Sequence, residues 1–139
     1  MVPLCPGITV VVIFRDSAET LPRFFDSLTE LGPEIVAVDT GSRDNSVAIC
    51  QSYGAKPYKI EWPDDFAAAK NFGFDKVETE WTMNLDSDEW LYPESAAAIQ
   101  RAMNNSGANA YEIQRQEVQP DGRSTSMNML RLWRTHPLM

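Results

Sequence analysis

Apolar residues occur along this chain in two kinds of run that alternate. The run 8–14 is rich in β-branched residues and shows no alternation of apolar and polar positions, which is typical of a central strand covered on both faces. In the segment that follows, apolar residues at 21, 24, 25, 28 and 31 fall on one face of a helix, for which Ser17 is the expected N-cap. The same alternation predicts strands over about 34–38, 56–61 and 81–85, and helices over about 46–53, 65–77 and 93–105.

The last third of the chain has a different pattern. Residues 110–119 and 124–133 read as two strands joined by a Pro-Asp-Gly turn, which predicts a hairpin. The predicted fold class is therefore α/β, with a mostly parallel mixed sheet flanked by helices and an antiparallel edge near the C-terminus. We expect the strand 124–133 to form that edge, and because edge strands invite pairing, we predict a homodimer through it.

Composition narrows the class of protein. The 139 residues fit a single domain, and 43% hydrophobic with 23% charged residues excludes a disordered chain. The net charge of −8 argues against nucleic acid as a partner. Two cysteines, Cys5 and Cys50, are too few for a disulfide framework and indicate a reducing compartment. With no apolar run long enough for a membrane span and no signal-peptide pattern, we expect a cytoplasmic protein.

Polar residues follow three of the predicted strands. They are Arg15 and Asp16, the segment 39–44, and the segment 86–89. Because ligands of open α/β sheets bind at the carboxyl ends of the strands, one site can use all three groups. No Gly-rich dinucleotide motif or P-loop follows any strand, so those two classes of nucleotide site lose their main support.

The segment Asp86-Ser87-Asp88 carries the sharpest local signal. In an extended segment, residues two apart point the same way, so both carboxylates can face one hard cation. Mg²⁺ or Mn²⁺ binds one or two carboxylates and completes its shell with water and substrate phosphates. The alternative is a solvated acidic turn before a helix, where negative charge is favourable.

Other candidate residues have an equally plain structural interpretation. Asp39 can accept hydrogen bonds from a base or ribose, or it can bond its own backbone in a turn. Asp44 fits a helix cap better than a ligand. Lys70 can face a phosphate or can be solvated. The single histidine, His136, has no evident partner for a catalytic triad or a zinc site.

Taken in order, these segments resemble the nucleotide-binding half of a family-two glycosyltransferase with the GT-A fold, of the bacterial type that builds lipopolysaccharide cores and surface glycans. The resemblance covers most of the chain and is carried by ITVVVIF (8–14), EIVAVDTGSRDNS (34–46), YGAK (53–56), DFAAAKN (65–71), WTMNLDSDE (81–89) and RLWR (131–134). One departure is the Arg-Asp-Ser at 15–17, where relatives usually have Lys-Asn-Glu.

The resemblance implies a metal-assisted, inverting transfer of a sugar from a UDP-linked donor to a glycan or lipid-linked acceptor, with peripheral membrane contact. It assigns residues 1–107 to the donor half and 108–139 to the start of an acceptor-side hairpin. It also implies donor-binding roles for Phe14, Arg15, Asp16, Asp39, Lys70 and Asp86, and Mg²⁺ or Mn²⁺ binding by Asp86 and Asp88.

The usual catalytic base of such relatives lies beyond the segment matched here, so none is assigned. Glu89, Glu117 and Asp121 are carboxylates that spacing alone does not support as the base. The alternative is a non-catalytic nucleotide- or glycan-binding module built on the same fold.

Overall fold

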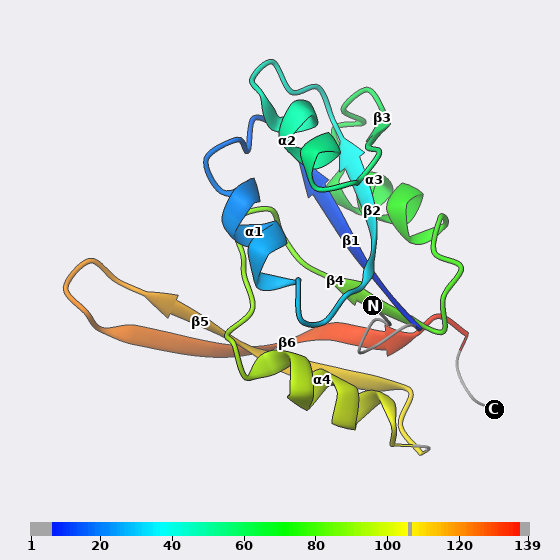
Figure 1. The fold of residues 1–139 in the computed structure, drawn as a ribbon, viewed down its shortest axis with the longest axis vertical. Coiled ribbons are helices and arrows are strands. Elements are labelled where there is room, and N and C mark those ends of the chain that lie inside the picture. Colours follow the sequence, from blue (N-terminus) through cyan, green and yellow to red (C-terminus); the bar gives the residue numbers. More distant parts are fainter. Residues whose placement is uncertain (1–6, 106, 137–139) are drawn as a thin grey trace.

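The computed structural model describes residues 7–105 and 107–136 and contains one six-stranded sheet (Figure 1). The strand order is β3-β2-β1-β4-β6-β5, in which β1, β2, β3 and β4 are parallel and β6 and β5 are antiparallel. The strands are β1 (Ile8–Phe14), β2 (Glu34–Asp39), β3 (Tyr58–Lys59), β4 (Trp81–Asn84), β5 (Ala110–Val118) and β6 (Ser124–Arg134). The predicted mixed α/β class with an antiparallel edge is confirmed. Cys5 lies outside the described residues, and Cys50 is buried and free.

Helices cover both faces of the sheet, as the uninterrupted apolar run of β1 predicts. On one face, alternate residues of β1 pack with α1 (Leu21–Ser27), α2 (Ser46–Ser52) and α4 (Ser95–Met103). On the other face, Val11 packs with Val36, Val38 and apolar residues of α3 (Phe66–Phe74). Burial on both sides explains why β1 needs no alternation of polar residues. None of the described helices has the length and apolar character to cross a membrane.

Two helix boundaries differ from those that the pattern predicts. Ser17 does not cap α1, because its hydroxyl donates to the carbonyl of Arg15, and the helix begins four residues later. The helix ends at Ser27, and the chain continues as turns to Gly32, whose φ of +62° lies in the left-handed region that favours glycine. By contrast, α3 begins close to the predicted start at residue 65, because Asp65 is its N-cap and accepts the N–H of Ala67 at 2.9 Å.

The position of the hairpin strands corrects one expectation. Strand β6 is not the edge of the sheet: its C-terminal end pairs with β4 and its whole length pairs with β5, so β5 is the outer strand. Leu132, which is buried where β6 pairs with Met83 of β4, explains this order, because β5 carries no fully buried residue. Strand β4 ends at Asn84, so in the described sheet residues 124–131 of β6 pair on one side only, and residues 127–131 line a cavity.

Candidate functional site

An open cavity of about 1180 Å³ lies at the carboxyl ends of β1 and β4. Its volume is at or above the range typical of small-molecule sites, so a ligand of that size or larger fits. The walls come from the end of β1 and the loop after it (residues 13–17, 19 and 20), from the start of α3, from the end of β4 and the loop after it (residues 84 and 86–88), and from residues 127–131 of β6. Six of the predicted site residues line it: Phe14, Arg15, Asp16, Lys70, Asp86 and Asp88.

Asp16 joins the loop after β1 to the loop after β2. Its Oδ1 accepts the N–H of Arg43 at 2.7 Å and that of Asp44 at 3.3 Å, and its own N–H donates to Ser42 Oγ at 2.9 Å. The residue has a positive φ of 50°, which aspartate tolerates better than most residues. Asp16 thus borders the cavity, while its carboxylate already holds two backbone amides.

Asp39 adopts the turn role that the sequence left open. Its side chain is buried, and Oδ1 accepts the N–H of Ser42 at 2.8 Å and that of Gly41 at 3.2 Å. Asp39 is not among the residues that line the cavity, whereas its neighbour Thr40 is. Asp39 is therefore paired with Phe14 in the β1–β2 register but lies outside the lining of the cavity.

Asn45 occupies the N-cap position of α2 without a side-chain bond, and Asp44, one residue earlier, bonds the first residue of the helix instead. Asp44 Oδ1 accepts the N–H of Ser46 at 2.9 Å, and its Oδ2 accepts the N–H of Ala18 at 3.1 Å. The hydrogen bond from Ser46 is the main cause that holds the pKa of this exposed carboxyl below its usual value. The loops after β1 and β2 are therefore fastened to each other by two carboxylates.

Lys70 and Asp86 meet on the cavity wall. The ammonium of Lys70 donates to Asn84 Oδ1 at 2.8 Å and to Asp86 Oδ1 at 3.1 Å. The side chains of Lys70 and Asp86 are 24% and 45% exposed, so both remain accessible to a ligand. Lys70 comes from α3 and Asp86 from the loop after β4. The ammonium group beside the carboxylate can face a phosphate group.

Sequence reasoning missed a charged cluster beneath this wall. Glu89 Oε2 lies 3.0 Å from Arg131 Nη2 and 3.1 Å from Arg115 Nε, and Glu89 Oε1 accepts the N–H of Asp86 at 2.7 Å. Arg131 also donates to the carbonyl of Asn84 at 3.2 Å. One signal was available: Arg131 interrupts the apolar end of β6, where a buried arginine requires a partner.

Asp88 is the predicted site residue with the most freedom. It is exposed, and within the described part of the chain its carboxylate makes no hydrogen bond or ion pair. Asp88 and Arg131 line both the large cavity and a second one of about 290 Å³, which lies between residues 85–95 and β5. Asp88 thus stands where the two cavities meet.

A divalent cation would find hard oxygen donors at Asp86 and Asp88, which are the ligands that Mg²⁺ and Mn²⁺ prefer. Among the described residues no group of three or more His, Cys, Asp or Glu side chains is placed to hold a metal ion. The chain therefore fits a cation that takes the rest of its shell from water and from a bound ligand's oxygens.

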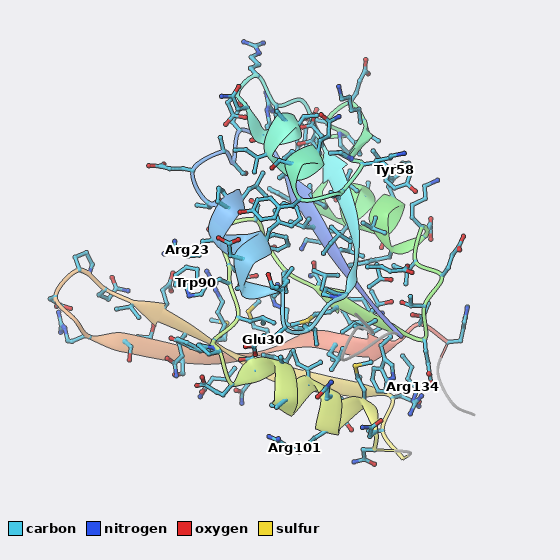
Figure 2. The ribbon with its side chains drawn as sticks, in the orientation of Figure 1. Arg23, Glu30, Tyr58, Trp90, Arg101 and Arg134 are labelled. Carbon is cyan, nitrogen blue, oxygen red and sulfur yellow. The ribbon has the colours of Figure 1, made fainter. Side chains whose placement is uncertain are left out.

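Aromatic side chains are divided between the core and the cavities. Trp81 is buried, whereas Trp62 lies on the wall of the large cavity in edge-to-face contact with Phe66, at 4.8 Å between ring centroids. Trp90 lines the second cavity, and the guanidinium of Arg23 lies 3.6 Å from its ring centroid (Figure 2). Both cavities therefore offer an aromatic face beside charged groups.

Known proteins are similar to this chain in sequence. A TPR repeat-containing protein of Synechococcus elongatus is 35% identical over 94% of this chain and 32% of its own length. The lipopolysaccharide core biosynthesis glycosyltransferase LpsC of Rhizobium meliloti is 32% identical over 66% of this chain and 34% of its own length. The chain thus spans about a third of the length of these relatives.

Solved structures share the fold at lower sequence identity. The crystal structure of S. aureus TarS superposes with a TM-score of 0.74 and 17% identity, over 93% of this chain and 28% of that one. A mannosyltransferase from Pyrobaculum calidifontis, in complex with GDP-Man and Mn²⁺, gives a TM-score of 0.62 and 20% identity over 80% and 36% of the two chains. The sequence model described as glycosyl transferase family 2 matches residues 9–138. This chain therefore belongs to glycosyl transferase family 2, and its fold is the GT-A fold.

Proposed function

We propose that this chain forms the donor-binding part of a glycosyltransferase that takes a UDP-linked sugar and transfers it, with inversion, to a glycan or lipid-linked acceptor. The observation that carries the proposal is the wall of the large cavity, where Lys70, Asp86 and the free Asp88 stand together. TarS in complex with UDP-GlcNAc, which has the same fold, supports a uridine nucleotide as the donor.

The charge of the cavity supports a divalent cation as a third component. Its lining has three cations, Arg15, Lys70 and Arg131, and four carboxylates, Asp16, Glu19, Asp86 and Asp88, a sum of 3 − 4 = −1. A nucleoside diphosphate is itself an anion, so the protein alone gives it no net attraction. Mg²⁺ or Mn²⁺, held by Asp88 and Asp86, would offset the charge that develops on the diphosphate leaving group. Lys70 adds a second positive charge beside it.

For the acceptor, we assign the side of the β5–β6 hairpin. The second cavity lies there and shares Asp88 and Arg131 with the donor cavity, so ligands in the two cavities would meet at Asp88. Its lining combines the ring of Trp90 with Tyr92, whose hydroxyl donates to Gln116 at 2.9 Å. Aromatic faces and amide groups suit a saccharide.

Calorimetric titration of UDP, with Mn²⁺ and with a chelator, tests the donor site. We expect Mn²⁺ to tighten UDP binding by about tenfold or more, equivalent to about 1.4 kcal/mol. Asp88→Ala should remove this enhancement, and Asp75→Ala, which deletes an exposed carboxylate at the end of α3, should leave it intact. Absence of UDP binding under both conditions, or binding indifferent to Asp88→Ala, contradicts the assignment.

A second assay separates an enzyme from a binding module. Incubation with UDP-sugars and a panel of glycan and lipid-linked acceptors measures transfer directly. Sustained transfer by the chain excludes a non-catalytic nucleotide- or glycan-binding module, whereas metal-dependent UDP binding without transfer to any acceptor favours it.

A further inference from the structure

Glu89 closes the turn that presents Asp86 and Asp88. Its own N–H donates to the carbonyl of Asp86 at 3.0 Å, and its Oε1 accepts the N–H of Asp86 at 2.7 Å. These two bonds run in opposite directions between the same two residues, so they fix the turn between them at both ends. The direction in which the two aspartates project therefore depends on the Glu89 side chain.

The same carboxylate anchors the turn to both strands of the hairpin. Glu89 Oε2 lies 3.0 Å from Arg131 on β6 and 3.1 Å from Arg115 on β5. The side chain of Glu89 is 12% exposed and that of Arg131 is 6% exposed, so solvent screens this pair far less than a surface ion pair. The two arginines and the N–H of Asp86 therefore fix the position of the Glu89 carboxylate.

Glu89 also competes with Asp86 for one arginine. Arg131 Nη2 lies 3.0 Å from Glu89 and 3.8 Å from Asp86 Oδ2. If Glu89 loses its charge, Asp86 becomes the nearest carboxylate to Arg131, and the guanidinium is drawn toward it. The net charge of this cluster also rises from +1 to +2, counted over Lys70, Arg115, Arg131, Asp86 and Glu89. Both changes oppose a divalent cation at Asp86.

We propose that Glu89 is a positioning residue for the cation and the diphosphate: it sets the turn and holds Arg131 away from Asp86, so that Asp86 stays available. This inference rests on the proposed function, because it presumes that a divalent cation and a nucleotide diphosphate meet at this turn. It assigns Glu89 no contact with the donor and no role as a catalytic base.

Glu89→Gln is the variant that tests the proposal, because it keeps the size of the side chain and removes its charge. We expect Mn²⁺-dependent UDP binding to weaken about tenfold or more, the usual effect of losing a residue that supports a metal site. Binding of UDP in chelator should be unchanged or tighter, because the site becomes more positive toward an anion. A general loss of fold would weaken both.

Glu80→Gln is the matched control. Glu80 pairs with Arg134 at 2.8 Å, and Figure 2 shows Arg134 near the end of β6 that lies away from the hairpin turn. This variant makes the same chemical change at another glutamate–arginine pair, and it should alter neither titration.

A second measurement needs no nucleotide. In Glu89→Gln, the Asp86 amide should exchange with deuterated solvent several times faster than in the wild type, while amides of β1 stay protected, because a neutral acceptor holds the N–H more weakly. Should Glu89→Gln fail to fold, Arg115→Gln takes its place. In this variant the less exposed Arg131 still holds Glu89 and the bonds within the turn remain, while the cluster becomes less positive, so Mn²⁺-dependent binding should be equal or tighter.

The outcomes separate this inference from the proposed function. A wild-type chain that binds no UDP overturns the proposed function, and Asp86 exchange then decides whether Glu89 holds the turn. The inference is overturned if the wild-type chain binds UDP with Mn²⁺ and the Glu89→Gln variant binds it equally well. It is also overturned if the variant binds UDP more weakly by the same factor with Mn²⁺ and with chelator. Unchanged Asp86 exchange in that variant, or weakening by Arg115→Gln, overturns it too.

Discussion

Gly73 lies where α3 comes closest to the sheet, and Gly73→Ala measures how tight that approach is. A Cβ at this position would lie 2.7 Å from Val11 Cγ1 and 3.3 Å from Val38 Cγ2. Both valines are completely buried, and their β-branched side chains have little rotational freedom. The methyl group therefore cannot be accommodated by a rotamer change, and α3 must move away from β1.

Two effects of opposite sign set the magnitude. Alanine in place of glycine inside a helix gains about 1 kcal/mol. Overpacking a well-packed core costs about 1–3 kcal/mol, and a contact of 2.7 Å to a rigid neighbour belongs in the upper part of that range. We therefore expect Gly73→Ala to lower the free energy of unfolding by about 1–2 kcal/mol, and Tm by roughly 3–8 °C for a chain of this size.

Thermal unfolding followed by circular dichroism measures this change. Ala68→Gly, at an exposed position of the same helix, reports helix propensity alone and should cost about 1 kcal/mol. A Gly73→Ala variant that is more stable than the wild type would refute the reasoning, because it would mean that α3 and β1 have room for a methyl group. Lys70 lies one turn earlier on α3, so the same variant should also weaken UDP binding.

Two further predictions concern ionisable groups. Burial, reinforced by the Asp39 carboxylate, raises the pKa of the Cys50 thiol from 9.0 to about 11, so in a Cys5→Ser variant a thiol reagent at pH 8 should label Cys50 in denaturant and leave the native chain unlabelled. Because the pKa is raised in the folded state, stability should fall as the pH rises from about 9 toward 11, and rapid native labelling would contradict the burial. Hydrogen bonds, first from Ser46, lower the pKa of Asp44 below its ordinary value of 3.8, so an NMR titration should give this carboxyl a midpoint below 3.8. Stability from this group is present above the ordinary aspartate pKa and is lost as the pH falls through the lowered one, where the amides of Ser46 and Ala18 should exchange faster.

The pattern of apolar residues predicted the parallel half of the sheet because its strands are buried on both faces. A run such as Ile8–Phe14 is buried on both faces only as a central strand with helices on each side of the sheet, so few other placements are open to it. Helix ends were less predictable, since the Ser17 hydroxyl has several acceptors within reach and the folded loop selects the carbonyl of Arg15.

Strand order at the hairpin depends on contacts that are remote in sequence. The turn at 120–122 predicts which residues of the hairpin pair with each other, and it says nothing about which strand joins β4. That choice follows from packing, because Leu132 and Trp133 lie beside Met83 and Thr82. The apolar residues at the end of β6 were the signal in the sequence that this strand, and not β5, lies against β4. They indicate an inner position, although β6 is the last strand of the chain.

The candidate site was predictable to the extent that it follows from topology. Residues after β1 and β4 converge because the carboxyl ends of parallel strands share one edge of a sheet. The cluster around Glu89 was not predictable in this way, because its partners Arg115 and Arg131 are 26 and 42 residues away and reach it from an antiparallel hairpin. Only a folded hairpin shows that two arginines of different strands face one carboxylate.

Among the aspartates that follow β1, β2 and β4, hydrogen-bond capacity separates the ones that shape the cavity from the ones that can meet a ligand. Asp16, Asp39 and Asp44 each accept two backbone N–H groups, so they are committed to holding their loops. In the described structure the carboxylate of Asp86 accepts a hydrogen bond only from the side chain of Lys70, and the carboxylate of Asp88 accepts none. A single side-chain partner such as Lys70 can move aside for a cation, whereas releasing two backbone amides breaks the bonds that hold a loop. The two aspartates after β4 are therefore the ones whose carboxylates a metal ion can recruit without unfolding a loop, and the other three keep the cavity in shape around it.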